Sequence, residues 1–157
     1  MAAYSVVTAT PFAAAAGAKT LILAIAPAGH GLTLVSFDIS FDGVTATAVP
    51  CLVEIVQSTQ GAAGTSGVTP TITQIRGRLA GGSAPTGGSN YTGEPTTLTR
   101  VAAYYVPQFM GVFTVQFPLG REFECDSCAG TIKAIGIRIT TTATVNVVGR
   151  LEVEALG

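Results

Sequence analysis

The sequence predicts an all-β protein, a two-sheet antiparallel sandwich that is jelly-roll-like in its wiring. The first observation is an alternation of apolar and polar residues, clearest at 35–42, 135–140 and 145–154. A period of two is typical of strands with one face in a core and the other in water. The second observation is that no window shows sustained helical periodicity. The third is that the apolar segments are short and bounded by Gly or Pro.

The clearest single strand runs over Val35–Asp42. Its apolar members are Val35, Phe37, Ile39 and Phe41, and each is followed by Ser or Asp. We therefore expect these four side chains to lie on the core face. Weaker strands, rich in Thr, Val, Ile and Tyr, are predicted at Tyr4–Ala9, Thr20–Ile25, Thr71–Arg76, Val101–Val106 and Val112–Phe117.

The 157 residues are expected to form one domain, because a chain of this length can bury a self-sufficient core. Two parts stand apart from the sandwich. Residues 1–18 are predicted as an N-terminal arm. Residues 58–100, loaded with Gly, Ser and Thr, are predicted as a long loop with one possible strand at Thr71–Arg76. Such a loop is either a mobile surface excursion or an arm that orders on a neighbouring subunit.

The charge content is low for a free domain. Only 11% of the residues are charged while 48% are hydrophobic, and the formal net charge is −1. A soluble surface usually carries about 25–35% charged residues, so we expect this chain to cover much of its surface with copies of itself or another protein. The scattered basic residues predict no nucleic-acid partner, and the apolar runs are too short to predict a membrane-spanning helix.

The residues that usually perform catalysis are sparse. His30 is the single histidine, lies between two glycines, and has no nucleophile motif near it. The paired carboxylates are better explained as the solvated faces of strands. We therefore expect no enzyme activity and no cofactor. The three cysteines, Cys51, Cys125 and Cys128, leave reduced thiols, a local disulfide and a metal site open.

Several residues are predicted as interface candidates. Aromatic residues and Met are enriched at the centres of interfaces, and the stretch around residues 104–110 combines both. The alternative is that some of these side chains fill the core. An arginine in the stretch 117–122 is suited to a bidentate contact with a carboxylate of a partner, or of its own neighbours. The candidates are Tyr91, Glu94, Tyr104, Tyr105, Phe109, Met110 and Arg121.

Five segments, in this order, resemble small virion proteins of tailed bacteriophages. They are Thr8–Pro11, Gly17–Leu21, Phe41–Val44, Asn90–Thr96 and Phe117–Glu122. The resemblance implies a capsid decoration (cement) protein. The resemblance implies a compact β-sandwich that forms a homo-oligomer, with a homotrimer favoured. It would be made in the host cytoplasm and bound to the major capsid protein on the outer surface of the phage head.

The resemblance leaves a second function open, because head and tail proteins require the same β-rich module with few charges. The alternative is a tail or fibre component whose sandwich binds a host-surface glycan. Tyr91, Tyr104 and Tyr105 would then be the rings that stack on sugar.

Overall fold

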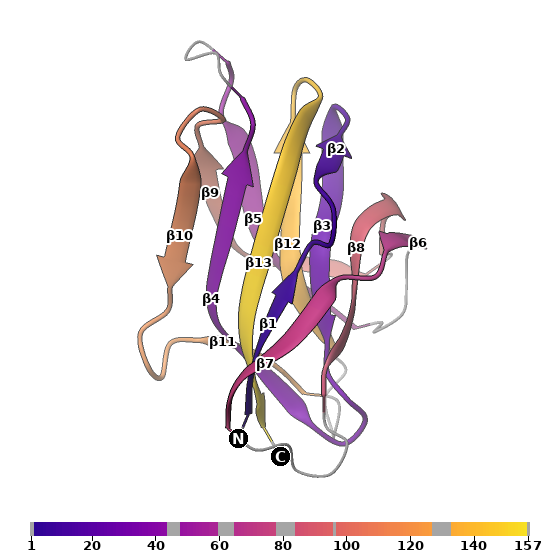
Figure 1. The fold of residues 1–157 in the computed structure, drawn as a ribbon, viewed down its shortest axis with the longest axis vertical. Coiled ribbons are helices and arrows are strands. Elements are labelled where there is room, and N and C mark those ends of the chain that lie inside the picture. Colours follow the sequence, from indigo (N-terminus) through magenta and orange to yellow (C-terminus); the bar gives the residue numbers. More distant parts are fainter. Residues whose placement is uncertain are drawn as a thin grey trace.

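The computed structural model describes residues 2–43, 48–59, 65–77, 84–95, 97–126 and 133–156. Within these ranges the chain forms strands and turns and no helix. The strands build two antiparallel sheets that pack face to face (Figure 1). The predicted all-β sandwich is therefore confirmed.

Sheet A has the strand order β10-β4-β13-β1-β7, with β11 also paired to β4 and β2 to β13. Its strands are β1 (Ala2–Val7), β2 (Phe12–Ala14), β4 (Gly31–Phe41), β7 (Thr71–Gly77), β10 (Val112–Gln116), β11 (Phe123–Asp126) and β13 (Val145–Leu156). Sheet B has the order β6-β8-β3-β12-β5-β9. Its strands are β3 (Gly17–Ile25), β5 (Cys51–Ser58), β6 (Thr65–Val68), β8 (Thr86–Gly93), β9 (Leu98–Val106) and β12 (Ala134–Thr141).

Eight of these strands follow the wiring of a jelly roll. Counted from one to eight along the chain, they are β1, β3, β4, β5, β9, β10, β12 and β13. Sheet A contains the first, eighth, third and sixth of them side by side, and sheet B contains the second, seventh, fourth and fifth. This is the order that two Greek keys produce, so the predicted jelly roll is also confirmed.

The segment 1–18, expected to be an arm, starts inside sheet A. Strand β1 lies between β13 and β7 and pairs with both. Tyr4 and Val6 are 2% and 0% exposed, so burial of apolar side chains draws this segment into the core. Strand β2 then pairs with β13. The prediction of an arm is wrong for the strands of this segment.

The stretch 58–100 contains more strands than predicted. Besides β7 it holds β6, β8 and the start of β9, while residues 60–64, 78–83 and 96 lie outside the described ones. The sequence of β8 has low strand propensity because of its glycines. Its pairing with β3 explains Gly87, since a Cβ there would lie 2.6 Å from the carbonyl oxygen of Leu23.

These inserted strands complete one edge of the sandwich. Strand β7 extends sheet A beyond β1, and β8 with β6 extends sheet B beyond β3. The chain leaves β5 next to one edge and returns to β9 at that same edge, after building the opposite one (Figure 1). The two edges of the molecule are therefore constructed differently.

Strand β4 follows the predicted alternation with one change. Phe37, Ile39 and Phe41 face the core as expected. The pairing with β13 shifts between Ser36 and Leu34, so Val35 is the extra residue of a bulge and is half-buried. The prediction of Val35 on the core face is therefore wrong, and Leu34 is fully buried instead.

Candidate functional site

Strands β9 and β10 form the edge of the sandwich that the inserted strands leave uncovered. They follow each other in the chain and lie at the ends of sheets B and A respectively. A short turn connects them, with the amide of Met110 donating to the carbonyl of Pro107 at 3.4 Å and Gly111 at φ +75°. In Figure 1, β10 and β9 lie together at one side of the molecule.

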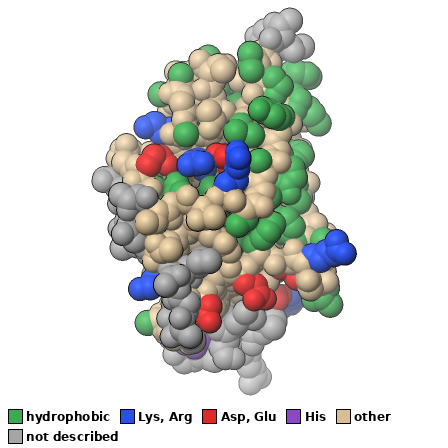
Figure 2. All heavy atoms as spheres, turned by 180° about the vertical axis from the view of Figure 1, so that it is seen from behind, with side chains coloured by type: hydrophobic (Ala, Val, Ile, Leu, Met, Phe, Trp, Pro, Cys, Tyr) green, Lys and Arg blue, Asp and Glu red, His purple; other side chains and the backbone are tan. Residues whose placement is uncertain are grey.

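Large apolar side chains are exposed along this edge. Their exposed fractions are 76% for Tyr105, 65% for Val112, 57% for Met110, 56% for Val49 and 46% for Phe109. The Gln108 amide donates to the carbonyl of Val49 at 2.9 Å, which joins the start of β5 to the turn. We call these five exposed side chains the apolar edge. Figure 2 shows hydrophobic side chains gathered along this margin of the molecule.

A cluster of aromatic rings supports the apolar edge from inside. The Phe37 ring centroid lies 5.9 Å from that of Tyr104 and 6.0 Å from that of Phe113. Tyr104 and Phe113 are 5.7 Å apart, and Phe117 packs against Phe37 at 6.2 Å. Apart from Phe37, these rings are only partly buried. The core therefore reaches the surface between β9 and β10.

Four of the five side chains of the apolar edge belong to a part of the chain without charge. Residues 101–120 include no Asp, Glu, Lys, Arg or His. Charged groups on the adjoining strands are paired: Arg150 donates to Asp38 at 2.5 Å, and Arg100 and Arg138 donate to Glu54 at 3.1 and 2.7 Å. An apolar partner at this edge therefore desolvates few charges.

The structure separates the predicted interface residues into four groups. Tyr105, Phe109 and Met110 lie together on the apolar edge. Tyr104 points the other way from its neighbour in β9 and packs in the aromatic cluster. Only Tyr105 among the three tyrosines proposed for sugar stacking therefore exposes most of its surface.

Tyr91 and Glu94 lie at the opposite edge and are engaged within the chain. Tyr91 is 3% exposed and packs with Leu23 and Val56. Its burial and the charge of Glu94 raise the pKa of Tyr91 to about 12. The Glu94 carboxylate accepts hydrogen bonds from the Thr20 amide at 2.7 Å and hydroxyl at 2.5 Å. These two residues hold β8 to β3, so the predicted ring of Tyr91 is not exposed to a partner and the Glu94 carboxylate is bound within the chain.

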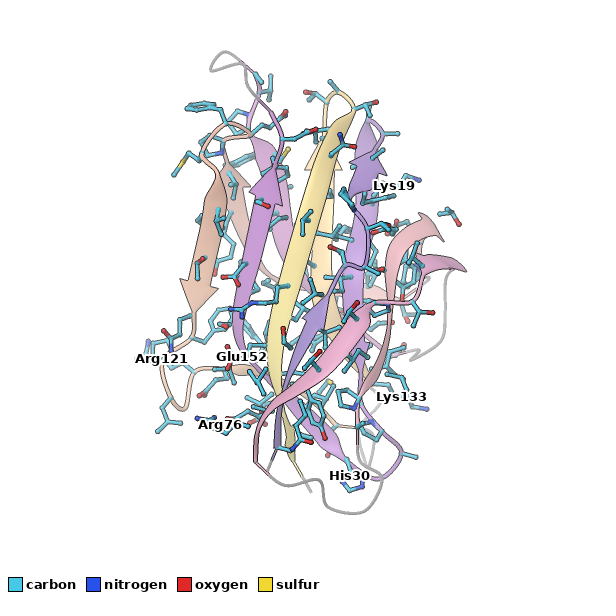
Figure 3. The ribbon with its side chains drawn as sticks, viewed as in Figure 1. Lys19, His30, Arg76, Arg121, Lys133 and Glu152 are labelled. Atoms are coloured by element: carbon cyan, nitrogen blue, oxygen red, sulfur yellow. The ribbon has the colours of Figure 1, made fainter. Side chains whose placement is uncertain are left out.

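Arg121 lies on the loop that follows β10, where its amide donates to the carbonyl of Pro118 at 2.9 Å. Figure 3 shows it beyond the end of β10, while Lys19 and Lys133 lie on the other side of the molecule. Within the described part of the chain Arg121 makes no ion pair with Glu122 or Glu124. Its neighbour Leu119 is 97% exposed.

Val49 and Val112 are members of the apolar edge that sequence reasoning missed. The sequence does contain a signal for Val112, because this residue lies in the run 101–120, which has no charged residue. A strand without charge is a candidate for an exposed edge that binds another chain. Val49 precedes β5 and is held at the apolar edge by the hydrogen bond that its carbonyl accepts from the Gln108 side chain. These two residues are distant in the sequence. Sequence spacing carries no signal for it.

Other candidate chemistry is weak among the described residues. They contain no group of three or more His, Cys, Asp or Glu suited to a metal. Cys51 and Cys125 are buried free thiols, and burial raises both pKa values to about 11, so neither is a thiolate near neutral pH. Cys128 lies outside the described residues. No helix formed by the described residues is long and apolar enough to cross a membrane.

Two shallow hollows lie on the outer face of sheet A, over β4 and β13. Their volumes are about 250 and 210 Å³, and Ser40 and Val148 line both. Sites that enclose a small molecule usually measure about 300–1,000 Å³. The apolar edge is therefore the stronger candidate for a functional surface.

The fold and this surface define a jelly-roll sandwich with large apolar side chains exposed along one edge. No family model and no curated protein matches the chain. Among solved structures it is similar to the D431N mutant VP2 protein of infectious bursal disease virus, from derived T=1 particles, at 10% identity and a TM-score of 0.23. That comparison covers 98% of this chain and 40% of the viral protein. A similarity this low carries no argument about fold or function.

Proposed function

We propose that this chain is a non-enzymatic structural protein of a bacteriophage particle. It binds the major capsid protein on the outer lattice of the head and stabilises the shell. The observation that carries the proposal is the apolar edge, where Tyr105, Met110 and Val112 are more than half exposed. Exposed apolar surface of this kind marks sites of contact with other proteins.

The energetics of such a contact suit a lattice protein. Full burial of a large apolar side chain contributes about 1.5–3 kcal/mol. A few such side chains on each copy produce a modest gain, from which the cost of association is subtracted. A capsid repeats the contact many times, so a modest contact at each junction strengthens the whole shell.

The low charge of the chain supports the same function. The protein has 8 basic and 9 acidic residues, and four of the basic residues form ion pairs with its own carboxylates. Desolvating an unpaired charge is expensive. A surface with few free charges is therefore suited to close contact with a neighbouring subunit.

The test is binding to phage heads that lack this protein. Purified chain is mixed with such heads and sedimented, and the bound fraction is measured against concentration. We expect the wild-type chain to sediment with the heads and Tyr105→Asp to bind about tenfold more weakly, a loss of roughly 1.4 kcal/mol. A reconstruction of the decorated head by electron microscopy then locates the bound copies.

Ile75→Asp is the matched control. Ile75 is 47% exposed on β7, at the opposite edge, so the same charge enters an equivalent strand away from the apolar edge. Equal binding by folded Tyr105→Asp and wild-type chains would contradict the role of the apolar edge. Failure of the wild-type chain to bind any head would overturn the proposed function.

A further inference from the structure

Four described strands end the strand orders of the two sheets, namely β10, β7, β6 and β9, and β10 is the most regular of them. It pairs with β4 in five consecutive positions, from Val112 opposite Ser40 to Gln116 opposite Ser36, with no shift of register. Each of the other edges contains a shift: β7 against β1, β9 against β5, and β6 against β8. Figure 1 shows β10 as the outermost strand of sheet A, with no described strand on its outer side.

The devices that normally block an exposed edge are missing from β10. Proteins protect such edges with charged side chains, proline or bulges, because unpaired backbone groups bind any other extended chain. The segment Val112–Gln116 has none of these. By contrast β7 carries Arg76 and β9 carries Arg100, and both strands also have a bulge. Strand β6 has no charge but contains a shift of register. Among the four described strands that end the sheets, β10 alone therefore lacks all three devices.

We propose that β10 pairs with β10 of a second copy of this chain. The two strands run antiparallel about a two-fold axis at Thr114, and they join sheet A of both copies into one continuous sheet. The contact is isologous, because the same strand serves both sides. This inference goes beyond the proposed function: it assigns β10 to a second copy of the chain, and the capsid contact is left to Tyr105, which lies on β9.

The side chains of β10 complement themselves in this register. Thr114 meets Thr114 of the partner subunit, and Phe113 meets Val115 of the partner subunit on the inner face. On the outer face Val112 lies opposite Gln116 of the partner subunit. Aromatic and β-branched residues form favourable cross-strand pairs, as do two threonines. No position places like charges against each other, since the strand has no charge.

The residues beyond the ends of β10 support the same arrangement. Antiparallel pairing about Thr114 brings the turn before β10 in one copy beside the turn after β10 in the other. The first turn carries Phe109 and Met110, which are 46% and 57% exposed, and the second carries Leu119, which is 97% exposed. Exposed apolar side chains thus come together at both ends of the paired strands, where they leave water.

A disulfide cross-link tests the pairing directly. Opposite Cα atoms of antiparallel strands are about 4.5–5.5 Å apart, within the range that a disulfide spans. Thr114→Cys, in a chain with Cys128→Ser, is oxidised at micromolar concentration. We expect most of it to become a covalent dimer, because Thr114 is exposed and the remaining cysteines are buried.

Thr73→Cys in the same background is the matched control. Thr73 is exposed on β7, the other edge strand of sheet A, and we expect little cross-linked product from it. Sedimentation of the wild-type chain supplies a second readout. The expected mass is twice the 15.9 kDa of one chain, with slower hydrogen exchange in β10 at high concentration. Thr114→Lys is expected to raise the dissociation constant at least tenfold.

The outcomes separate this inference from the proposed function. A monomer or a trimer by mass, or equal cross-linking of Thr73→Cys and Thr114→Cys, overturns the two-fold pairing. A chain that is monomeric alone and cross-links through Thr114→Cys only to capsid protein also overturns it. A dimer that binds no phage head supports the pairing and contradicts the function instead.

Discussion

Glu54 and Arg138 lie directly opposite each other on β5 and β12, and the Arg138 Nε donates to the Glu54 carboxylate at 2.7 Å. Arg100, on β9, donates to the second oxygen of the same carboxylate at 3.1 Å. The Glu54 side chain is 3% exposed, whereas Arg138 and Arg100 are 26% and 56% exposed. One buried carboxylate therefore joins three strands of sheet B, including the edge strand that carries Tyr105.

Glu54→Ala is expected to destabilise the protein by about 2–3 kcal/mol. Removing one member of a buried ion pair usually costs about 3–5 kcal/mol, and the partial exposure of both arginines reduces the loss. The measurement is the free energy of unfolding in urea. Glu154→Ala is the control, because its partner Arg76 is 71% exposed, and such pairs contribute about 0–1 kcal/mol. Equal losses for the two variants would contradict the role given to Glu54.

The same carboxylate makes stability depend on pH. Burial raises the pKa of Glu54, but the hydrogen bonds and charges of Arg138 and Arg100 outweigh it and hold the pKa below its ordinary 4.5. The triad therefore contributes fully above pH 4.5, and the contribution is lost as pH falls through the folded pKa. We expect the stability difference between wild type and Glu54→Gln to shrink on acidification from pH 6 to pH 3. A difference that stays constant would refute this.

Substitution by alanine should reduce the folding stability much more at Tyr104 than at Tyr105. Tyr104→Ala removes a ring from the aromatic cluster and is expected to cost about 2–4 kcal/mol of folding free energy. Tyr105→Ala should change stability by no more than about 0.5 kcal/mol, because the side chain is 76% exposed. Thermal or urea unfolding of both variants checks this. A large loss for Tyr105→Ala alone would show that its ring packs within the chain.

Gly136→Ala tests how closely β12 approaches β3. A Cβ at Gly136 would lie 2.0 Å from the carbonyl oxygen of Ile22 and 2.7 Å from a Leu23 methyl group. The backbone oxygen has little room to move, so we expect a loss of about 1–3 kcal/mol or more. Gly120→Ala is a contrasting variant, because nothing lies within 4 Å there and the strain comes from its φ of +79°. Unchanged stability of Gly136→Ala would contradict the close approach.

Cys51 and Cys125 should resist thiol reagents in the native protein. Both are buried, and their pKa values of about 11 leave little thiolate at pH 8. We expect labelling of these two residues to be at least about a hundredfold slower in the native state than in urea, since reaction requires opening. Mass spectrometry of digests locates the label. Rapid native labelling of either residue would show that it is accessible.

Much of the fold could be predicted because the alternation of apolar and polar residues indicates which side chains of a strand are buried. Period two alone predicts Phe37, Ile39 and Ile137 on the core face, and all three are buried. The alternation could not reveal the bulge at Val35, because the shift depends on the pairing of β4 with β13. Strand β8 was missed for a similar reason, as its glycines suit a close neighbour and lack strand propensity.

The predicted interface residues are exposed where they lie on an uncharged segment and buried where a partner strand covers them. Phe109 and Met110 precede β10 in a run without charge and are exposed. Tyr91 has the same aromatic character, yet it is 3% exposed because it packs with Leu23 on β3, far away in the sequence. The residue type indicates which side chains are suited to contact with another protein. The pairing of strands decides whether those side chains are exposed.

The sequence by itself determined the all-β class, the low charge and the uncharged run 101–120, because composition and period two are properties of neighbouring residues. Only the tertiary structure decided which strands of the jelly roll remain at the ends of the two sheets. Strands of the segment between β5 and β9 cover the β1 and β3 side, while β9 and β10 end their sheets without a further described strand. A strand stays at the edge of a sheet when no further strand pairs with its outer side. Which strands pair depends on contacts between residues that are distant in the chain.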